Sequence, residues 1–272
     1  MSSAFELERV SFDYEGIPAI HELSLALGHG ERVALVGANG SGKSTLLRIL
    51  DGLYFPSSGE VRFDGELLTA ERLRGNGFGF VFRRRVGLVL QNPDAQLFNP
   101  TVFDEIAYAP LQLQWTRDEI LQRVNHTLAL MALEPLRHRP PYRLSGGEKK
   151  RVALASVLVL DPEILLLDEP TAALDPRSQG QVIDLIQQWK GTRKTIITAT
   201  HQLDILEDIA DRVIVLDSGR MLASGTPAEI LAQEELLLKA NLIHAHRHTH
   251  GGMTHSHAHT HRHSHGGHEH EH

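Results

Sequence analysis

Residues 37–44 read Gly-Ala-Asn-Gly-Ser-Gly-Lys-Ser and fit the pattern G-x-x-x-x-G-K-[ST], in which each fixed position has a chemical purpose. The glycines allow consecutive backbone N–H groups to converge on phosphate oxygens without a Cβ atom in the way. The context also fits, because a short apolar run over residues 32–36 precedes the loop and helical spacing begins at Ser44. The pattern therefore predicts that Lys43 reaches the β- and γ-phosphates of a nucleotide and that Ser44 holds Mg²⁺.

Two neighbouring carboxylates, Asp168 and Glu169, follow the apolar run over residues 164–167. An acidic pair after a strand is by itself usually a solvated turn. In a parallel sheet shared with the phosphate loop, however, both side chains would stand at the edge where ligands bind. Asp168 could then orient Mg²⁺ and its waters, and Glu169 could polarise the water that attacks the γ-phosphate. The two motifs together therefore predict ATP hydrolysis.

A third motif, Leu144-Ser-Gly-Gly-Glu148, opens a helix with Ser145 as its cap. Alone, it would be interpreted as a helix cap and nothing more. The backbone N–H groups at such a helix start can also bind an anion. We expect a helical insert around residues 95–160 to carry this site away from the phosphate loop, so that it serves a neighbouring subunit.

The elements that must position these residues alternate along the chain. We expect strands over residues 5–14, 32–36, 86–90, 164–167, 195–199 and 213–216, and helices over 44–53, 145–160, 176–189 and 202–210. Asp64-Gly65 predicts a hairpin turn within residues 61–68, and residues 101–133 are helical with a break at Pro110 and a capping box formed by Thr116 and Glu119. This alternation predicts an α/β fold with a mostly parallel sheet covered on both faces.

Composition narrows the classes of function. The 272-residue chain is 41% hydrophobic and has no cysteine, which excludes disulfides, thiolate metal sites and a cysteine nucleophile. The formal charge of -7 falls on the folded body, because Arg247, Arg262, Glu269 and Glu271 cancel in the tail, and an acidic body argues against nucleic acid as a partner. The start lacks the order of a secretory signal, and no apolar run approaches the ~20 residues of a spanning helix, so we expect no membrane-spanning segment.

After Asn241 the composition changes abruptly, and thirteen of the last 29 residues are histidine. Such a segment cannot bury a core, so we expect residues 241–272 to be disordered without a ligand and residues 1–240 to form the folded domain. Imidazole suits Ni²⁺, Co²⁺, Cu²⁺ and Zn²⁺, and the glycine pairs at 251–252 and 266–267 would let several rings converge on one ion. A purification tag or an inert tail is the alternative, although tags are usually consecutive histidines. The expected transition-metal ligands are His244, His246, His248, His250, His255, His257, His259, His261, His263, His265, His268, His270 and His272.

Residues 4–240 resemble an ATP-binding-cassette (ABC) ATPase, because the motifs stand in the order of that family. Residues 37–45 resemble its Walker A loop, residues 144–148 its signature, and Asp168 with Glu169 its Walker B pair. The resemblance implies a P-loop NTPase core with an antiparallel β subdomain and a helical subdomain. It also implies a dimer in which the signature of one subunit covers the γ-phosphate bound to the other.

The resemblance assigns roles to further residues. Tyr14 matches the aromatic residue that stacks on adenine, Gln91 the Q-loop glutamine and His201 the switch histidine, which should contact the γ-phosphate and steady Glu169. Ala173-Leu174-Asp175 match the D-loop, and Glu148 stands where many members have glutamine. The expected catalytic residues are Lys43, Gln91, Glu169 and His201, and those expected to hold Mg²⁺ are Ser44, Gln91 and Asp168. The expected nucleotide-binding residues are Tyr14, Gly37, Ala38, Asn39, Gly40, Ser41, Gly42, Lys43, Ser44 and Thr45, and the signature residues are Leu144, Ser145, Gly146, Gly147 and Glu148.

The segment after Gln91 narrows the group. It reads Asn-Pro-Asp-Ala-Gln-Leu-Phe and is followed by Thr101-Val102, which resembles the ATPases of energy-coupling-factor (ECF) importers of vitamins and transition-metal ions. With the histidine tail, this suggests the ATPase of a cobalt or nickel importer at the cytoplasmic face of the cell membrane. The implied partners are a second ABC ATPase subunit, identical or a paralogue, a transmembrane coupling subunit and a metal-binding membrane subunit.

Three alternatives stay open at this point. The first is the ATPase of a vitamin-type ECF importer, and the second is a soluble ABC protein that buffers metal. The third is a soluble cassette of DNA repair or translation, but such proteins usually have a second cassette, a coiled-coil insert or basic patches, and none is visible. Because the Irving–Williams order alone favours Cu²⁺ on imidazole, the tail does not identify the transported ion.

Overall fold

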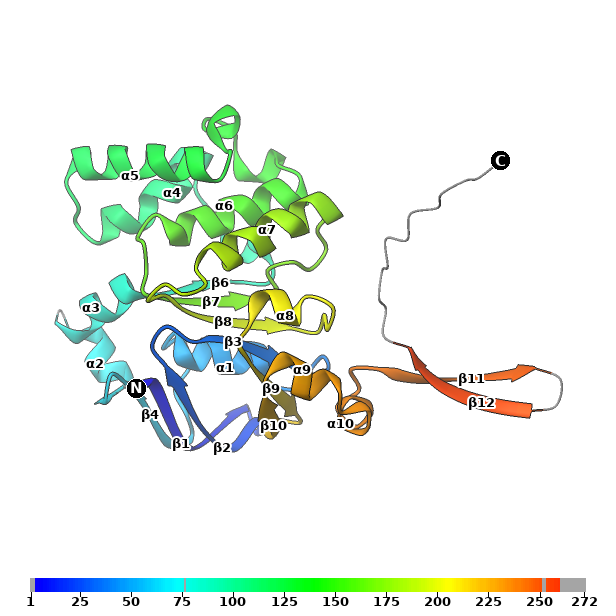
Figure 1. The fold of residues 1–272 in the computed structure, drawn as a ribbon. Coiled ribbons are helices and arrows are strands. Elements are labelled where there is room, and N and C mark those ends of the chain that lie inside the picture. Colours follow the sequence, from blue (N-terminus) through cyan, green and yellow to red (C-terminus); the bar gives the residue numbers. More distant parts are fainter. Residues whose placement is uncertain (1–2, 76, 251–252, 260–272) are drawn as a thin grey trace, which may run out of the picture.

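The computed structural model describes residues 3–75, 77–250 and 253–259. A central sheet of six strands runs through the body (Figure 1). In spatial order its strands are β10 (Arg220–Gly225), β9 (Arg212–Asp217), β3 (Arg32–Val36), β8 (Thr195–Thr200), β7 (Ile164–Asp168) and β6 (Val86–Val89). All neighbours are parallel except β10 and β9, so the predicted mostly parallel sheet is confirmed.

A second, antiparallel sheet supplies the implied β subdomain. Its strands are β2 (Ile17–Gly28), β1 (Ser3–Tyr14), β4 (Ser58–Phe63) and β5 (Glu66–Leu67), in that order. Asp64 and Gly65 both have positive φ, at 49° and 79°, and connect β4 to β5, which confirms the predicted hairpin turn. No prediction covered β2, although Leu23, Leu25 and Leu27 alternate with exposed residues there as in a half-buried strand.

The central sheet separates two hydrophobic cores. In β3, Ala34 and Val36 belong to the core beneath the helical layer, whereas Val33 and Leu35 belong to the core shared with the antiparallel sheet. Successive side chains of a strand point to opposite faces, so a short run of apolar residues can serve both cores at once. All five residues of β3 are buried, which confirms the expectation of a sheet covered on both faces.

The helices divide between these two faces (Figure 1). Helix α1 (Lys43–Leu50) packs into the core shared with the antiparallel sheet. Helices α4 (Val102–Gln112), α5 (Arg117–Leu130) and α6 (Gly146–Leu158) form the helical subdomain with the short 3₁₀ turns η1 (Pro93–Ala95), η2 (Glu134–Leu136) and η3 (Pro141–Arg143). The remaining helices are α2 (Ala70–Arg74), α3 (Phe78–Arg85), α7 (Pro176–Gln188), α8 (Leu206–Ile209), α9 (Pro227–Leu231) and α10 (Glu234–Lys239).

Two helix predictions need correction, and one is confirmed. The capping box of Thr116 and Glu119 opens α5 as expected. Pro110 does not break the preceding helix, because it lies in the last turn of α4 and removes only one intrahelical donor there. The helix predicted over 202–210 is limited to α8, since the Gln202 N–H donates to the Thr200 hydroxyl at 3.1 Å and begins a turn instead.

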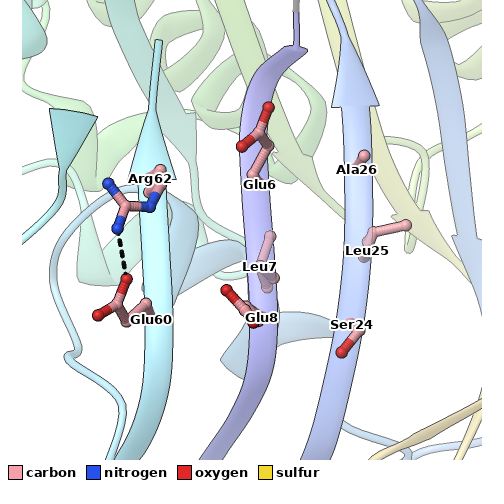
Figure 2. A pocket seen from close by; sticks show the side chains of 8 residues that line it. All are labelled: Glu6, Leu7, Glu8, Ser24, Leu25, Ala26, Glu60 and Arg62. Carbon is pink, nitrogen blue, oxygen red and sulfur yellow. Dashed lines mark hydrogen bonds and ion pairs between the residues drawn. The ribbon is translucent and has the colours of Figure 1, made fainter. Parts of the chain in front are cut away.

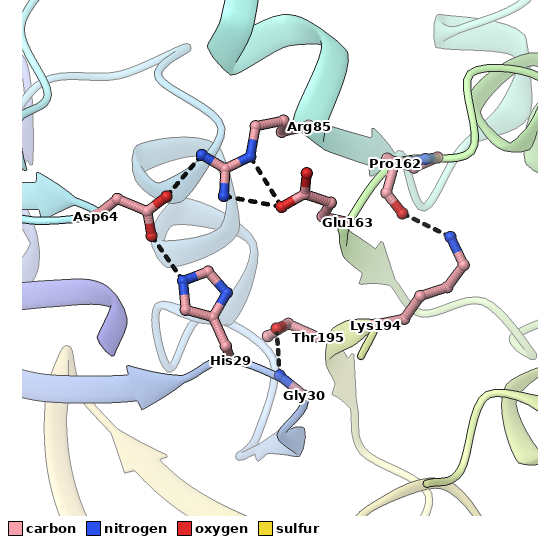
Figure 3. Close-up of polar contacts among 8 residues, drawn as sticks. All are labelled: His29, Gly30, Asp64, Arg85, Pro162, Glu163, Lys194 and Thr195. Carbon is pink, nitrogen blue, oxygen red and sulfur yellow. Dashed lines mark hydrogen bonds and ion pairs between the residues drawn. The ribbon is translucent and has the colours of Figure 1, made fainter. Parts of the chain in front are cut away.

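A charged network ties the antiparallel sheet to the central one (Figure 3). Asp64, in the β4–β5 turn, accepts from His29 Nε2 at 2.6 Å and pairs with Arg85 at 2.6 Å. Arg85 also pairs with Glu163, which directly precedes β7, at 2.8 Å. The network therefore joins the β4–β5 turn, the segment before β3, the end of α3 and the start of β7.

Residues 241–243, predicted to belong to the histidine-rich tail, still pack on the folded body. Ile243 is buried and the Leu242 N–H donates to the Leu237 carbonyl at 2.9 Å, so packing continues three residues beyond 240. Strands β11 (His244–His250) and β12 (Met253–His259) then form a hairpin that pairs with no other described strand. An isolated hairpin is at best marginally stable in water, so disorder without a ligand stays a prediction. Residues 260–272 of the predicted tail lie outside the described residues.

No helix in the described part of the chain is long and apolar enough to cross a membrane.

Candidate nucleotide site

The predicted site residues follow the carboxyl ends of four adjacent parallel strands, β3, β8, β7 and β6. The phosphate loop follows β3, His201 follows β8, Asp168 ends β7, and Gln91 stands two residues after β6. The register pairs Val36 with Thr200, which brings the loop and the histidine to the same edge. This is the edge at which ligands bind in open α/β sheets.

The glycines of the loop have distinct reasons for lacking a side chain. A Cβ on Gly37 would lie 2.3 Å from the Leu216 carbonyl oxygen, and one on Gly42 would lie 2.8 Å from the Ala19 carbonyl oxygen. Gly42 also has φ of 105°, which only glycine adopts readily. Nothing lies within 4 Å of a Cβ built on Gly40, so this part of the loop is open on the outside.

The side chain of Lys43 lies inside the phosphate loop. Its Nζ donates to the carbonyl oxygens of Gly37 at 2.7 Å and Ala38 at 3.1 Å, and the residue is buried. Burial lowers the pKa of Lys43 below its ordinary value, and the charges of Glu169 and Asp168 act in the opposite direction. The ammonium is thus held by two neutral acceptors that a charged phosphate oxygen could outcompete.

Ser44 and Asp168 lie 124 residues apart in the sequence and are hydrogen-bonded in the structure. Ser44 Oγ donates to Asp168 Oδ1 at 2.9 Å, and Asp168 is 1% exposed. Burial raises the pKa of Asp168, with the bond from Ser44 acting against it. A hydroxyl beside a carboxylate that is costly to ionise is a donor set that suits Mg²⁺, which prefers hard oxygen ligands and whose charge would stabilise the carboxylate.

Glu169 and His201 form the second polar pair. Glu169 Oε1 lies 2.9 Å from His201 Nδ1, while Glu169 Oε2 is buried without a hydrogen-bond partner in the described structure. The backbone of Glu169 has φ of 47°, a left-handed conformation that is uncommon for a residue other than glycine, and its N–H is held by the Ala199 carbonyl at 2.9 Å. An unpaired buried oxygen on a strained backbone is typical of a residue that waits for a ligand.

Tyr14 lies beside the start of α1. Its hydroxyl is 3.1 Å from Thr45 Oγ1, its ring packs edge-on against Phe12 and Tyr54, and the residue is 37% exposed. The structure therefore places an accessible aromatic ring next to the phosphate loop. Its role as the adenine platform stays a prediction.

The side chain of Gln91 does not contact the other predicted Mg²⁺ ligands by a hydrogen bond in the described structure. The residue is exposed, and the hydrogen bonds within the described residues include none from its side chain to Ser44 or Asp168. Its carbonyl oxygen, however, accepts from Lys150 Nζ at 2.9 Å. Burial lowers the pKa of Lys150 to about 8, against the charges of Asp168 and Glu169. No prediction named Lys150, because a lysine two residues after Glu148 is indistinguishable by type from its neighbour Lys149.

The signature segment is separated from the phosphate loop within this chain. Helix α6 lies in the helical layer and α1 beneath the sheet (Figure 1). Ser145 caps α6 in a capping box, in which the Ser145 N–H donates to Glu148 Oε2 at 2.8 Å and the Glu148 N–H donates to Ser145 Oγ at 3.3 Å. In the described structure the N–H groups of Gly146 and Gly147 donate to no acceptor, so both are free for an anion.

The signature also lies next to the predicted D-loop. A Cβ on Gly147 would be 3.1 Å from Ser178 Oγ, and Ser178 donates from that oxygen to Asp175 Oδ2 at 2.6 Å. Asp175 also caps α7 by accepting from the N–H groups of Arg177 and Ser178. The hydrogen bond from the Ser178 hydroxyl, together with these N–H bonds, lowers the pKa of Asp175. The two motifs thus share one surface.

Together, these residues fit the phosphates of a nucleotide and one Mg²⁺ ion. The loop offers backbone donors and a buried ammonium, the Ser44–Asp168 pair offers oxygen ligands, and Glu169 offers a carboxylate held by the His201 imidazole. By contrast, a hollow of about 380 Å³ over β1, β2 and β4 contains none of the predicted site residues (Figure 2). It is lined by Glu6, Leu7, Glu8, Ser24, Leu25, Ala26, Glu60 and Arg62.

Comparisons with known proteins agree with this arrangement. The model of the ABC transporter family matches residues 20–172. The nickel import ATP-binding protein NikO of Rhodobacter capsulatus is 53% identical over 246 residues, which cover 89% of this chain and 97% of that protein. The energy-coupling factor transporter ATP-binding protein EcfA2 of Methanospirillum hungatei is 41% identical, over 89% of this chain and 60% of that protein.

Solved structures are similar over most of the chain. The structure of cbiO1 from Clostridium perfringens, part of the ABC transporter complex cbiONQ, has a TM-score of 0.74 and 36% identity, and the match covers 89% of this chain and 96% of that one. A dimeric ATP-binding cassette in a post-hydrolysis state, bound to ADP and Pi, has a TM-score of 0.73 and 27% identity, over 82% of this chain and 98% of that one.

Proposed function

Because the chain belongs to the ABC transporter family as the ATP-hydrolysing subunit of an importer, we propose that it energises the uptake of a transition-metal ion, nickel or cobalt. The 53% identical relative is a nickel import ATP-binding protein, and a 36% identical structure is part of the complex cbiONQ. The observation that carries the proposal on this chain is the combination of the Glu169–His201 pair with a histidine-rich segment appended to the same body.

In the proposed mechanism the phosphate loop binds the nucleotide first, and Asp168 and Glu169 act afterwards. The free backbone N–H groups and Lys43 receive the β- and γ-phosphates, and Lys43 exchanges its two carbonyl acceptors for phosphate oxygens. Ser44 and Asp168 would hold Mg²⁺, with Gln91 as a further ligand. At this position Mg²⁺ would supply positive charge that stabilises the charge developing on the transferred phosphoryl group.

Glu169 is the proposed general base. Its oxygen Oε2 has no partner in the described structure and can accept the proton of a water molecule. Its other oxygen is engaged by His201 Nδ1, so the ring fixes the direction of the carboxylate. The second ring nitrogen, Nε2, is left for a hydrogen bond with the γ-phosphate.

A second ABC ATPase subunit completes the proposed site. The N–H groups of Gly146 and Gly147 and the hydroxyl of Ser145 are the donors that α6 offers to a phosphate bound by the partner. Helix α6 and the phosphate loop lie in different layers of one chain, which is the arrangement that a two-subunit site requires. Binding of ATP would then close the dimer, and hydrolysis would release it.

The surface around residues 92–98 is the proposed contact with a transmembrane coupling subunit. Phe98 is 67% exposed and packs edge-on against Tyr108, which is 40% exposed, at a centroid distance of 4.9 Å. Its backbone is held firmly, since the N–H groups of Phe98 and Asn99 both donate to the buried Glu105 carboxylate. A rigid, exposed aromatic pair is a surface that favours a protein partner. This contact would hold the chain at the cytoplasmic face of the membrane. A metal-binding membrane subunit is the further proposed member of the complex.

The tail is the proposed transition-metal site of this chain. In the β11–β12 hairpin, the register places His244 opposite His259, His246 opposite His257 and His248 opposite His255. Imidazole is a ligand that suits Ni²⁺, Co²⁺ and Zn²⁺, and histidines recur at alternate positions of this segment. Binding of Ni²⁺, Co²⁺ or Zn²⁺ would then stabilise a hairpin that is marginal alone.

Uptake measurements test the transport proposal. Cells that lack this gene would be complemented with the wild-type chain or with Glu169→Gln, and nickel and cobalt accumulation would be measured separately. We expect the wild type alone to restore uptake of one of the ions, and small integral-membrane subunits to copurify with it. Normal accumulation of both ions without the gene, with recovery as a particle free of membrane subunits, would contradict the proposal.

A further inference from the structure

Three side-chain contacts fasten the segment around Gln91 to α6. Lys149 Nζ donates to Asp94 Oδ1 at 2.6 Å, near the surface. The Gln96 amide bridges the two elements, because Oε1 accepts from the Leu90 N–H at 3.0 Å and Nε2 donates to the Ala153 carbonyl at 2.8 Å. Lys150 makes the third contact and is the one that acts on Gln91 itself.

Lys150 is a buried lysine whose ammonium contacts only main-chain carbonyl oxygens among the described hydrogen bonds. The residue is 2% exposed, and its Nζ donates to the carbonyl oxygens of Gln91 at 2.9 Å and Leu90 at 3.4 Å. Among the described residues, it forms no ion pair. Removing an ammonium from water is costly, and an apolar side chain would cost less at a site that required only packing. The charge is directed at two main-chain oxygens of a single loop.

No strand ladder in the described structure fixes the main chain at Gln91 itself. Gln91 and Asn92 are exposed, and β6 ends at Val89, so the backbone of Gln91 has no ladder partner. Lys150 holds the carbonyl group of Gln91, and the Gln91 side chain is attached to the neighbouring Cα atom. The position of the main chain therefore sets the position of this side chain. A small displacement of a positioned group costs rate, and about 1 Å can reduce turnover by about 10²-fold.

We propose that Lys150 is a positioning residue for ATP hydrolysis, which holds the main chain of Gln91 and ties it to the helix that begins with the signature. The inference rests on the role proposed above for Gln91. Because α6 carries Ser145, Gly146 and Gly147 at its start, a movement of this helix on the partner's nucleotide would be passed through Lys150 to Gln91 in the chain's own site.

Steady-state ATPase measurements on the full chain, at varied ATP and varied Mg²⁺, test this inference. Lys150→Met removes both hydrogen bonds of the ammonium, to the Gln91 and Leu90 carbonyls, but keeps an unbranched side chain of similar length. We expect kcat to fall about tenfold, the KM for ATP to change less than about threefold, and the half-saturating Mg²⁺ concentration to rise. Lys150→Gln keeps an N–H donor without the charge and should recover part of kcat. The matched control is Lys239→Met, which removes an exposed ammonium from the last turn of α10 and should stay within about twofold of wild type.

A double-mutant cycle separates this inference from the role of Gln91. If Lys150 acts through Gln91, Lys150→Met should have little further effect on kcat in a Gln91→Ala background. An equally large loss in both backgrounds would overturn the inference, as would a folded Lys150→Met chain with wild-type kcat and Mg²⁺ dependence. If Lys150→Met does not fold by thermal melting, Lys150→Gln decides, and a wild-type Mg²⁺ dependence and kcat would again overturn it. Full activity of Gln91→Ala alone would instead contradict the role of Gln91.

Discussion

Glu169 concentrates at one residue the features that distinguish a reactive carboxylate from a structural one. Its backbone is left-handed, one carboxylate oxygen is held by His201, and the other is buried with no partner in the described structure. Neighbouring Asp168 has ordinary strand geometry and is engaged by Ser44. Two adjacent carboxylates thus have different surroundings, which permits one to serve the metal and the other the water.

Glu169→Gln removes the proposed base and changes the size of the side chain very little. We expect ATP binding to persist and turnover to fall by at least about 10²-fold, because general bases contribute at least this much. The variant should also trap an ATP-dependent dimer, measurable by light scattering. Glu235→Gln, at an exposed position of α10, is the control. Hydrolysis by Glu169→Gln at the normal rate would show that the base has been misassigned.

Lys43→Ala removes a buried ammonium and leaves the Gly37 and Ala38 carbonyls without its hydrogen bonds. We expect ATP affinity to fall by about tenfold to hundredfold, because hydrogen bonds to charged groups contribute about 1.5–3 kcal/mol. Equilibrium binding of a fluorescent ATP analogue measures this, and a thermal melt separates it from loss of folding. An unchanged affinity in a folded variant would contradict the proposed contact with phosphate.

At the scale of elements, the phosphate loop is shaped by the strands around it as much as by its own residues. Gly37 abuts the last carbonyl but one of β9, and Gly42 abuts β2, which is part of the other sheet. The loop therefore closes only when both sheets are in place. This explains why Gly37 and Gly42 are constrained by different neighbours, although the pattern in the sequence presents these two glycines alike.

Gly37→Ala tests this packing directly. The added Cβ would lie 2.3 Å from a backbone oxygen, so we expect destabilisation by about 1–3 kcal/mol in urea unfolding, as for other overpacked sites. Gly180→Ala is the matched control, because its Cβ on α7 would meet nothing within 4 Å, and alanine favours a helix by about 1 kcal/mol. Equal stability of the two variants would show that the loop adjusts without cost.

At the scale of the whole molecule, the body and the tail meet at a sharp boundary. Ile243 is the last residue for which burial in the core is described, and the hairpin that follows pairs only with itself among the described strands. The described part of the tail therefore contributes no strand to the sheets of the ATPase body. Its function should be separable from ATP turnover.

Truncation after Ile243 tests this separation. We expect the shortened chain to hydrolyse ATP within about twofold of the wild type, because no element of the site is removed. Titration calorimetry with Ni²⁺, Co²⁺ and Zn²⁺ should show loss of the strong binding sites, whereas a chain that ends at His259 keeps the hairpin histidines and should keep part of the capacity. Loss of ATP turnover on truncation would instead favour a protein whose primary role is metal handling.

The amino-acid sequence by itself determined the order and type of most elements and the identity of the motifs. Residues 37–44, Asp168 and Glu169 could be recognised because local backbone chemistry demands those residue types at those spacings. The apolar runs of β3 and β7 predicted buried parallel strands, and Thr116 with Glu119 predicted a helix start, because period and capping are local properties. The fate of Pro110 and the strand β2 were missed, since packing decides whether such weak signals are realised.

Only the tertiary structure decided at what distance and with what burial the side chains meet. It joined Ser44 to Asp168 and Glu169 to His201 through the adjacency of β3, β8 and β7, which no local pattern encodes. It likewise distinguished Lys150 from Lys149, since burial against the Gln91 carbonyl depends on how α6 packs beside the end of β6. Spacing along the chain specifies which groups are present, but the free energy of a contact depends on distance and burial, and these are properties of the folded molecule alone.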